Sequence, residues 1–168
     1  MKSTLTGAAA LVTGASSGIG AATARRLAGH GACVALVARR RDRLQALAAE
    51  IGEAGGTALV VEADITDRTQ AEAAVQQAAG LFGRLDILFN NAGLMLLGPV
   101  AGADPEEWNR MIALNVQGLL YTTRAALPTC CRPPRRAVAG SPTSSTSARS
   151  PAASPGTATA STASPSSA

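Results

Sequence analysis

One glycine-rich segment constrains the fold of this chain more than any other feature. An apolar run at residues 8–12 leads directly into residues 13–20, which read Thr-Gly-Ala-Ser-Ser-Gly-Ile-Gly, and a helical pattern follows at about residues 18–29. Glycines at such a junction allow a tight turn, close approach of the backbone to a pyrophosphate and close packing of helix against strand. Phosphate groups would then accept hydrogen bonds from the free N–H groups at the start of the helix. We therefore expect a nucleotide-binding strand–turn–helix unit; the alternative is an ordinary strand-to-helix turn.

Short apolar runs alternate with helical patterns as far as about residue 127. The other apolar runs lie at residues 33–38, 58–61 and 85–89, and the other helical patterns at residues 42–53, 68–82 and from Asp104 onward. Continuously apolar strands separated by helices indicate a parallel sheet buried on both faces, and right-handed crossovers make it doubly wound. The predicted fold class is therefore α/β, with a Rossmann-like, doubly wound parallel sheet.

The last part of the chain differs in kind. Of the 28 residues from 141 to 168, 26 are Ser, Pro, Thr or Ala, and none is a large apolar residue. Such a segment cannot offset the entropy lost when a chain becomes ordered. We expect an incomplete dinucleotide-binding domain over residues 1–128, whose sheet ends after about the fourth strand, and a disordered tail over residues 129–168.

Charge and composition narrow the possible partners. The formal net charge is +4, and 14 of the 15 basic residues are arginines, which favours phosphate-bearing ligands. Most of these arginines are scattered and no aromatic platform lies beside them for stacking bases, so we expect no nucleic-acid partner. No stretch approaches the roughly 18 apolar residues of a membrane span, and the cysteines lack metal-ligand spacing. We expect a cytoplasmic protein without a metal site.

Four motifs in this order resemble those of the short-chain dehydrogenases/reductases. The first is the TGxxxGIG spacing of residues 13–20; the others are Asp64-Ile65, the Asn-Asn-Ala-Gly run at residues 90–93 and the Asn-Val-Gln-Gly run at residues 115–118. The resemblance covers about residues 5–128. It implies that Asp64 contacts an adenine ring, that residues 90–93 stabilise the sheet and border the cofactor, and that Asn115 is a catalytic asparagine in a proton relay. An ordinary mid-helix asparagine is the alternative for Asn115.

The resemblance also implies a set of cofactor-binding residues and a choice between two cofactors. Members that prefer NAD carry an acid after the second strand, whereas residues 38–41 here read Ala-Arg-Arg-Arg. An arginine can bind a 2′-phosphate bidentately and an acid would repel it, so NADP is expected, with NAD as the alternative. These arginines could instead only solvate a helix start. The predicted cofactor-binding residues are Thr13, Gly14, Ser16, Ser17, Gly18, Ile19, Gly20, Arg39, Arg40, Asp64, Ile65, Asn91, Ala92 and Gly93.

The catalytic serine and the tyrosine–lysine pair that the resemblance implies are absent as the chain is written. The only tyrosine, Tyr121, is followed four residues later by Ala125 rather than by lysine. When each codon's third base is grouped with the next two bases, the tail can encode a serine at position 149, a tyrosine at 162 and a lysine at 166. This is the spacing that the family uses. We hypothesise a one-base frame shift between about residues 128 and 141; a natural low-complexity tail is the alternative.

These expectations combine into one functional prediction. The intact relative would be an NADP(H)-dependent oxidoreductase that transfers hydride between nicotinamide and a small alcohol or ketone. This chain would bind the dinucleotide without turning it over, and the surface through which such enzymes oligomerise would be lost. The alternative is a non-catalytic dinucleotide-binding or regulatory module with a flexible tail.

Overall fold

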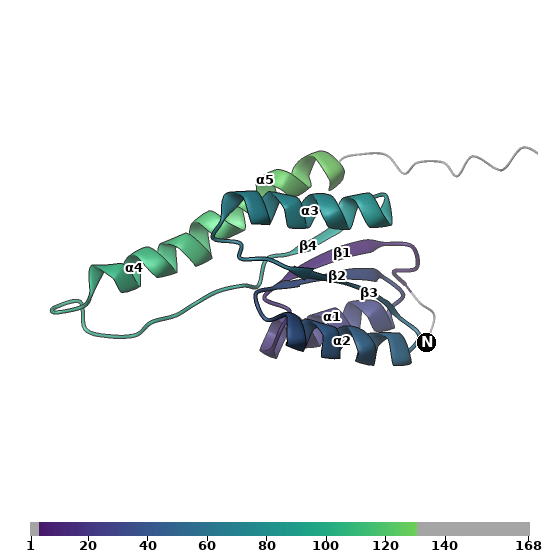
Figure 1. The fold of residues 1–168 in the computed structure, drawn as a ribbon, viewed down its shortest axis with the longest axis horizontal. Helices are drawn as coiled ribbons and strands as arrows, with labels where there is room; N and C mark the ends of the chain where they lie inside the picture. Colours follow the sequence, from purple (N-terminus) through teal and green to yellow (C-terminus); the bar gives the residue numbers. More distant parts are fainter. Residues whose placement is uncertain (1–3, 131–168) are drawn as a thin grey trace, which may run out of the picture. The chain divides into compact units, whose positions relative to one another are not determined.

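A computed structural model describes residues 4–130 of the chain, and these residues form a parallel sheet with helices on both faces (Figure 1). The strands are β1 (Ala9–Thr13), β2 (Cys33–Ala38), β3 (Thr57–Glu62) and β4 (Ile87–Phe89), in the spatial order β3-β2-β1-β4. The helices are α1 (Gly18–Gly29), α2 (Arg41–Glu53), α3 (Arg68–Phe82), α4 (Pro105–Ile112), the π-helical turn η1 (Ala113–Gly118) and α5 (Leu119–Cys130). All strand pairs are parallel. The predicted doubly wound, Rossmann-like fold class is confirmed.

The two faces of the sheet carry separate cores, because alternate side chains of a strand point to opposite faces. On one face Ala10 and Val12 of β1 pack with buried residues of α1 and α2; on the other, Leu11 packs with α3 and with Ala126 of α5. Alanine supplies much of the helix side of each core: Ala21, Ala24 and Ala28 in α1, and Ala71, Ala74 and Ala78 in α3. Small side chains let the helices lie close to the sheet, as the near absence of aromatics requires.

The helix starts follow local sequence rules. Asp67 caps α3 by accepting a 2.9 Å hydrogen bond from the backbone N–H of Gln70, and Asp104 caps α4 in the same way from Glu106. Pro105 occupies the first helical position, where its missing N–H carries no penalty. The Gln70 side chain does not return a hydrogen bond to Asp67: it accepts from the N–H of Asp64, and the N–H of Asp67 donates to the carbonyl oxygen of Asp64.

The long helix predicted from Asp104 is interrupted by one π-helical turn and extends further than expected. Residue 113, at the α4–η1 junction, keeps ordinary α-helical torsions, so α4, η1 and α5 form one continuous rod. α5 includes Pro128 and ends at Cys130, two residues past the predicted domain boundary. The predicted division at residue 128 stays a prediction, because the tail and the proposed frame shift lie outside the described residues.

Apolar side chains are exposed along this rod, and β4 lies at an edge of the described sheet. The exposed large hydrophobic residues of the rod are Trp108, Ile112, Val116, Leu119, Leu120 and Leu127. An apolar sheet edge and an uncovered apolar helix face both favour association.

Candidate nucleotide-binding site

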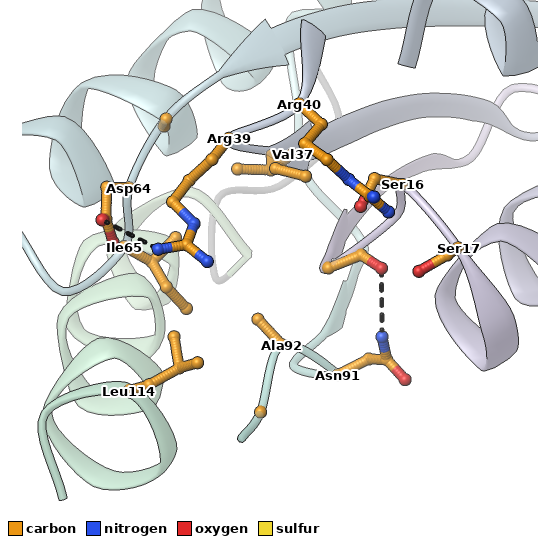
Figure 2. A pocket seen from close by; sticks show the side chains of 14 residues that line it. Ser16, Ser17, Val37, Arg39, Arg40, Asp64, Ile65, Asn91, Ala92 and Leu114 are labelled. Atoms are coloured by element: carbon orange, nitrogen blue, oxygen red, sulfur yellow. Dashed lines mark hydrogen bonds and ion pairs between the residues drawn. The ribbon is translucent and has the colours of Figure 1, made fainter. Parts of the chain in front are cut away.

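A cleft of about 430 Å³ lies at the carboxyl ends of the strands, and Figure 2 shows the side chains that line it. Open α/β sheets bind their ligands at this edge. The lining residues come from five separate segments: Gly14, Ser16 and Ser17; Val37, Ala38, Arg39 and Arg40; Ala63, Asp64 and Ile65; Asn91, Ala92 and Gly93; and Leu114 of η1.

The glycine-rich turn forms one wall and leaves the start of α1 open. Gly14 and Gly18 adopt φ values of +66° and +57°, which side chains rarely allow. A Cβ atom on Gly20 would lie 2.4 Å from the carbonyl oxygen of Gly14, so the turn can close on the helix only without one. Ser17 occupies the N-cap position without a side-chain hydrogen bond. Unlike α3 and α4, α1 therefore presents N–H groups that no side chain caps.

Thr13 and Asn91 fix the floor of the cleft. The Thr13 Oγ1 atom accepts hydrogen bonds from the backbone N–H groups of Asn91 (3.0 Å) and Ala92 (3.1 Å). The Asn91 side-chain amide donates in return to the carbonyl oxygen of Thr13 at 3.1 Å. Thr13 is fully buried, so its role in the structure is to join the ends of β1 and β4 beneath the cleft.

Two arginines and one carboxylate supply the charge of the cleft. Arg39 Nη1 lies 3.8 Å from Asp64 Oδ2, and in Figure 2 the Arg40 side chain extends toward Ser16. Asp64 is itself held by Thr66, whose N–H and hydroxyl donate to Oδ1 at 3.0 and 2.8 Å. The lining therefore carries two positive charges against one negative charge, beside the positive end of the α1 dipole. This electrostatic environment favours an anionic ligand.

The π-helical turn approaches the cleft from the long rod. The Asn115 side chain brackets the backbone of Leu94: Oδ1 accepts its N–H and Nδ2 donates to its carbonyl oxygen, each at 2.8 Å. A Cβ atom on Gly118 would lie 3.0 Å from the side chain of Ile65, so glycine lets the rod pack closely behind the cleft wall. Short π-helical insertions are frequent at functional sites.

Asn90 ties the same rod to the end of β4. Its Oδ1 atom accepts from the hydroxyl of Thr122 at 2.8 Å, and its Nδ2 atom donates to the hydroxyl oxygen of Thr123 at 2.9 Å. Thr122 is fully buried. The first asparagine of the Asn-Asn-Ala-Gly run therefore orients a helix, whereas the second holds the glycine-rich turn.

Most of the predicted cofactor-binding residues meet in the cleft, and four do not line it. Thr13 lies beneath the floor, Gly18 and Gly20 shape the turn, and Ile19 lies outside the lining with 72% of its surface exposed. Asn115 is adjacent to the cleft through Leu114 but does not line it. The sequence reasoning missed Val37, Ala38, Ala63 and Leu114; the first three could have been found from the rule that carboxyl ends of parallel strands share one edge.

Two further features of the described residues bear on other functions. Within residues 4–130, no helix is both long and apolar enough to cross a membrane. The same residues hold no group of three or more His, Cys, Asp or Glu side chains placed to bind a metal ion.

Comparisons with known proteins converge on one family. The family described as short chain dehydrogenase matches residues 8–154 of this chain. An uncharacterized oxidoreductase of Staphylococcus aureus is 42% identical over 125 residues, which are 74% of this chain and 53% of that protein. The chain thus spans about half the length of such curated relatives.

Solved structures agree with the sequence comparison. A short-chain dehydrogenase/reductase mutant from Serratia marcescens superposes with a TM-score of 0.72 at 41% identity, covering 74% of this chain and 51% of that one. A short chain dehydrogenase from Burkholderia cenocepacia, solved in complex with NADP, gives a TM-score of 0.71 at 39% identity over the same shares of the two chains.

Proposed function

This chain belongs to the short-chain dehydrogenase/reductase family, and on that premise we propose that its cleft binds a nicotinamide dinucleotide, with NADP preferred over NAD. One observation carries the proposal: the glycine-rich turn, the uncapped start of α1 and two arginines line a single cleft at the carboxyl edge of the sheet. The relatives solved with NADP support the choice of ligand class.

The residues of the cleft fit such a ligand. The backbone of Gly14 and the N–H groups that begin α1 would hold the pyrophosphate, since a dipole and free donors meet there. Asp64 and Ile65 would border the adenine, and Ala92 and Gly93 the nicotinamide side. The tight Gly14–Gly20 contact supports this assignment, because it removes the side chains that would otherwise block the approach to the turn.

The preference for NADP rests on Arg39 and Arg40. Both line the cleft, directly after the end of β2. A guanidinium group binds a phosphate through paired hydrogen bonds, which an adenosine ribose hydroxyl cannot match. Arg40 also occupies the N-cap position of α2, where positive charge opposes the helix dipole, so a compensating ligand role is reasonable there.

Binding without turnover is the second part of the proposal. When bound, the nicotinamide supplies a hydride donor or acceptor for alcohol–ketone chemistry. Asn115 is the remaining family catalytic residue, and its side chain holds Leu94 beside the cleft. Tyr121 packs among the core residues beside α3, and Ala125 follows it where a lysine would be needed to lower a phenol pKa.

A fluorescence titration with NADPH and NADH tests both parts. We expect saturable binding of both nucleotides, tighter binding of NADPH, loss of that preference in an Arg39→Ala, Arg40→Ala double variant, and no consumption of NADPH with ketone substrates. Equal affinity for the two nucleotides would refute the NADP preference, and turnover by this polypeptide would refute the absence of catalysis.

A nucleotide read across codons 125–168 and several hundred bases beyond tests the frame shift separately. An open shifted frame that encodes the serine, tyrosine and lysine would identify the gene as that of an ordinary reductase. If the shifted frame closes at once, the non-catalytic dinucleotide-binding module becomes the function of the chain.

A further inference from the structure

The cleft contains an ion pair whose two members would both face the same end of a bound dinucleotide. Arg39 follows β2 and Asp64 lies two residues beyond β3, and their charged atoms are 3.8 Å apart. The register of the two strands aligns Ala38 with Glu62, so both residues emerge at the same corner of the sheet. At 3.8 Å the contact is electrostatic and too long for a hydrogen bond.

One end of this pair is held by hydrogen bonds, and the other end is largely exposed. Thr66 donates two hydrogen bonds to Asp64 Oδ1, and the Gln70 side chain accepts the Asp64 backbone N–H at 3.0 Å. The Arg39 side chain is 75% exposed and its ion pair with Asp64 is its one salt bridge within residues 4–130. The fixed carboxylate therefore sets where the arginine head group rests.

Arg40 differs from its neighbour, since it forms no salt bridge within the described residues. Figure 2 shows its side chain extending toward Ser16, away from Asp64. One arginine at the mouth of the cleft is thus available to an anionic ligand, and the other is shared with a protein carboxylate.

We propose that Asp64 is a specificity-determining residue that limits the preference for NADP by competing with the 2′-phosphate for Arg39. This inference rests on the proposed function of the cleft. A fixed carboxylate and a ligand phosphate are both anions, and one guanidinium cannot pair fully with both. Removal of the Asp64 charge releases Arg39 toward the phosphate, whereas a cofactor without that phosphate gains nothing from the released arginine.

The test is the ratio of the NADH and NADPH dissociation constants, measured by fluorescence titration. Asp64→Asn keeps a side-chain oxygen for Thr66, and its effects on the adenine apply to both nucleotides and cancel in the ratio. Exposed ion pairs contribute up to about 1 kcal/mol, so we expect the ratio to shift toward NADPH by about two- to fivefold. The same substitution in an Arg39→Ala background should leave the ratio unchanged.

Glu62→Gln is the matched control. Glu62 pairs with Arg41 at 3.7 Å, in a similar exposed geometry, but neither residue lines the cleft. The control should therefore keep the wild-type ratio. Asp64→Ser, which also retains an acceptor for Thr66, serves as a second variant if Asp64→Asn does not fold.

The outcomes separate this inference from the proposed function. An unchanged ratio in both Asp64 variants overturns it, and so does a shift that persists in the Arg39→Ala background, because the carboxylate would then act on the phosphate directly. Failure of the unaltered chain to bind either nucleotide would instead overturn the proposed function.

Discussion

Thr13 and Asn91 form two hydrogen bonds with each other across the ends of β1 and β4. The Thr13 hydroxyl accepts the backbone N–H of Asn91, and the Thr13 carbonyl oxygen accepts from the Asn91 side-chain amide. Because the Thr13 hydroxyl also accepts the N–H of Ala92, a single buried oxygen fixes the path of the chain after β4. The same asparagine lies against the glycine-rich turn, so the geometry of the cleft floor depends on this contact.

Replacement of Thr13 by valine should lower stability without changing side-chain shape. Two backbone N–H groups would lose their acceptor, and an unsatisfied buried donor costs about 1–3 kcal/mol. Urea unfolding measures the change. Thr57→Val, at an exposed position of β3, should alter the free energy of unfolding by less than about 0.5 kcal/mol. Equal effects of the two substitutions would contradict the role assigned to Thr13.

Two glycine-to-alanine substitutions should change the free energy of unfolding in opposite directions. In Gly20→Ala the new methyl group would meet the Gly14 carbonyl oxygen at 2.4 Å, and overpacking of this kind costs about 1–3 kcal/mol. In Gly80→Ala, inside α3, nothing lies within 4 Å of the new methyl, so helix propensity should raise stability by about 0.5–1 kcal/mol. Thermal unfolding of both variants gives the comparison, and nucleotide binding should weaken only in Gly20→Ala.

Asn115→Ala should release the segment that follows β4. Both hydrogen bonds from the Asn115 side chain go to the backbone of Leu94, so the Leu94 amide should lose protection against hydrogen exchange. Asn109→Ala is the control, because among residues 4–130 the Asn109 side chain bonds only to Glu106 of the same helix. Unchanged protection at Leu94 would show that other contacts hold this segment.

Asp86 should make stability fall in acid. Burial by itself raises the pKa of Asp86, but the hydrogen bond from Arg84, the Ala9 N–H and the charge of Arg84 together lower it below its ordinary value. A lowered folded-state pKa stabilises the fold above the unfolded-state pKa of about 3.9, and this stability is lost as the pH falls from there through the folded-state pKa.

Unfolding midpoints of the wild type and Asp86→Asn between pH 7 and 2 test this prediction. The variant should be less stable at pH 7, and the difference should shrink below about pH 4. The pKa of Glu72 is lowered by its hydrogen bond with Arg68, so Glu72 also makes stability fall in acid. The stability of the Asp86→Asn variant should therefore still depend on pH to some extent. A difference that is constant across the range would rule out the ionised carboxylate as its source.

The amino-acid sequence by itself determined the parts of this protein that depend on local chemistry. Continuous apolar runs predicted the parallel strands to within one or two residues, Asp104 marked a helix start, and the Gly14–Gly20 turn predicted a phosphate-binding strand–turn–helix unit. These features follow from propensity, capping and backbone freedom, which act over a few residues and are legible without knowledge of the fold.

Only the tertiary structure decided which distant side chains meet. The β2–β3 register brings Arg39 to Asp64, the close packing allowed by Gly118 brings the rod against Ile65, and Asn90 reaches Thr122 across 32 positions. No local pattern of residues predicted the π-helical turn at Ala113–Gly118 inside the long helix. The physical reason is that strand order, register and helix packing set these distances, and they arise from the burial of both sheet faces together.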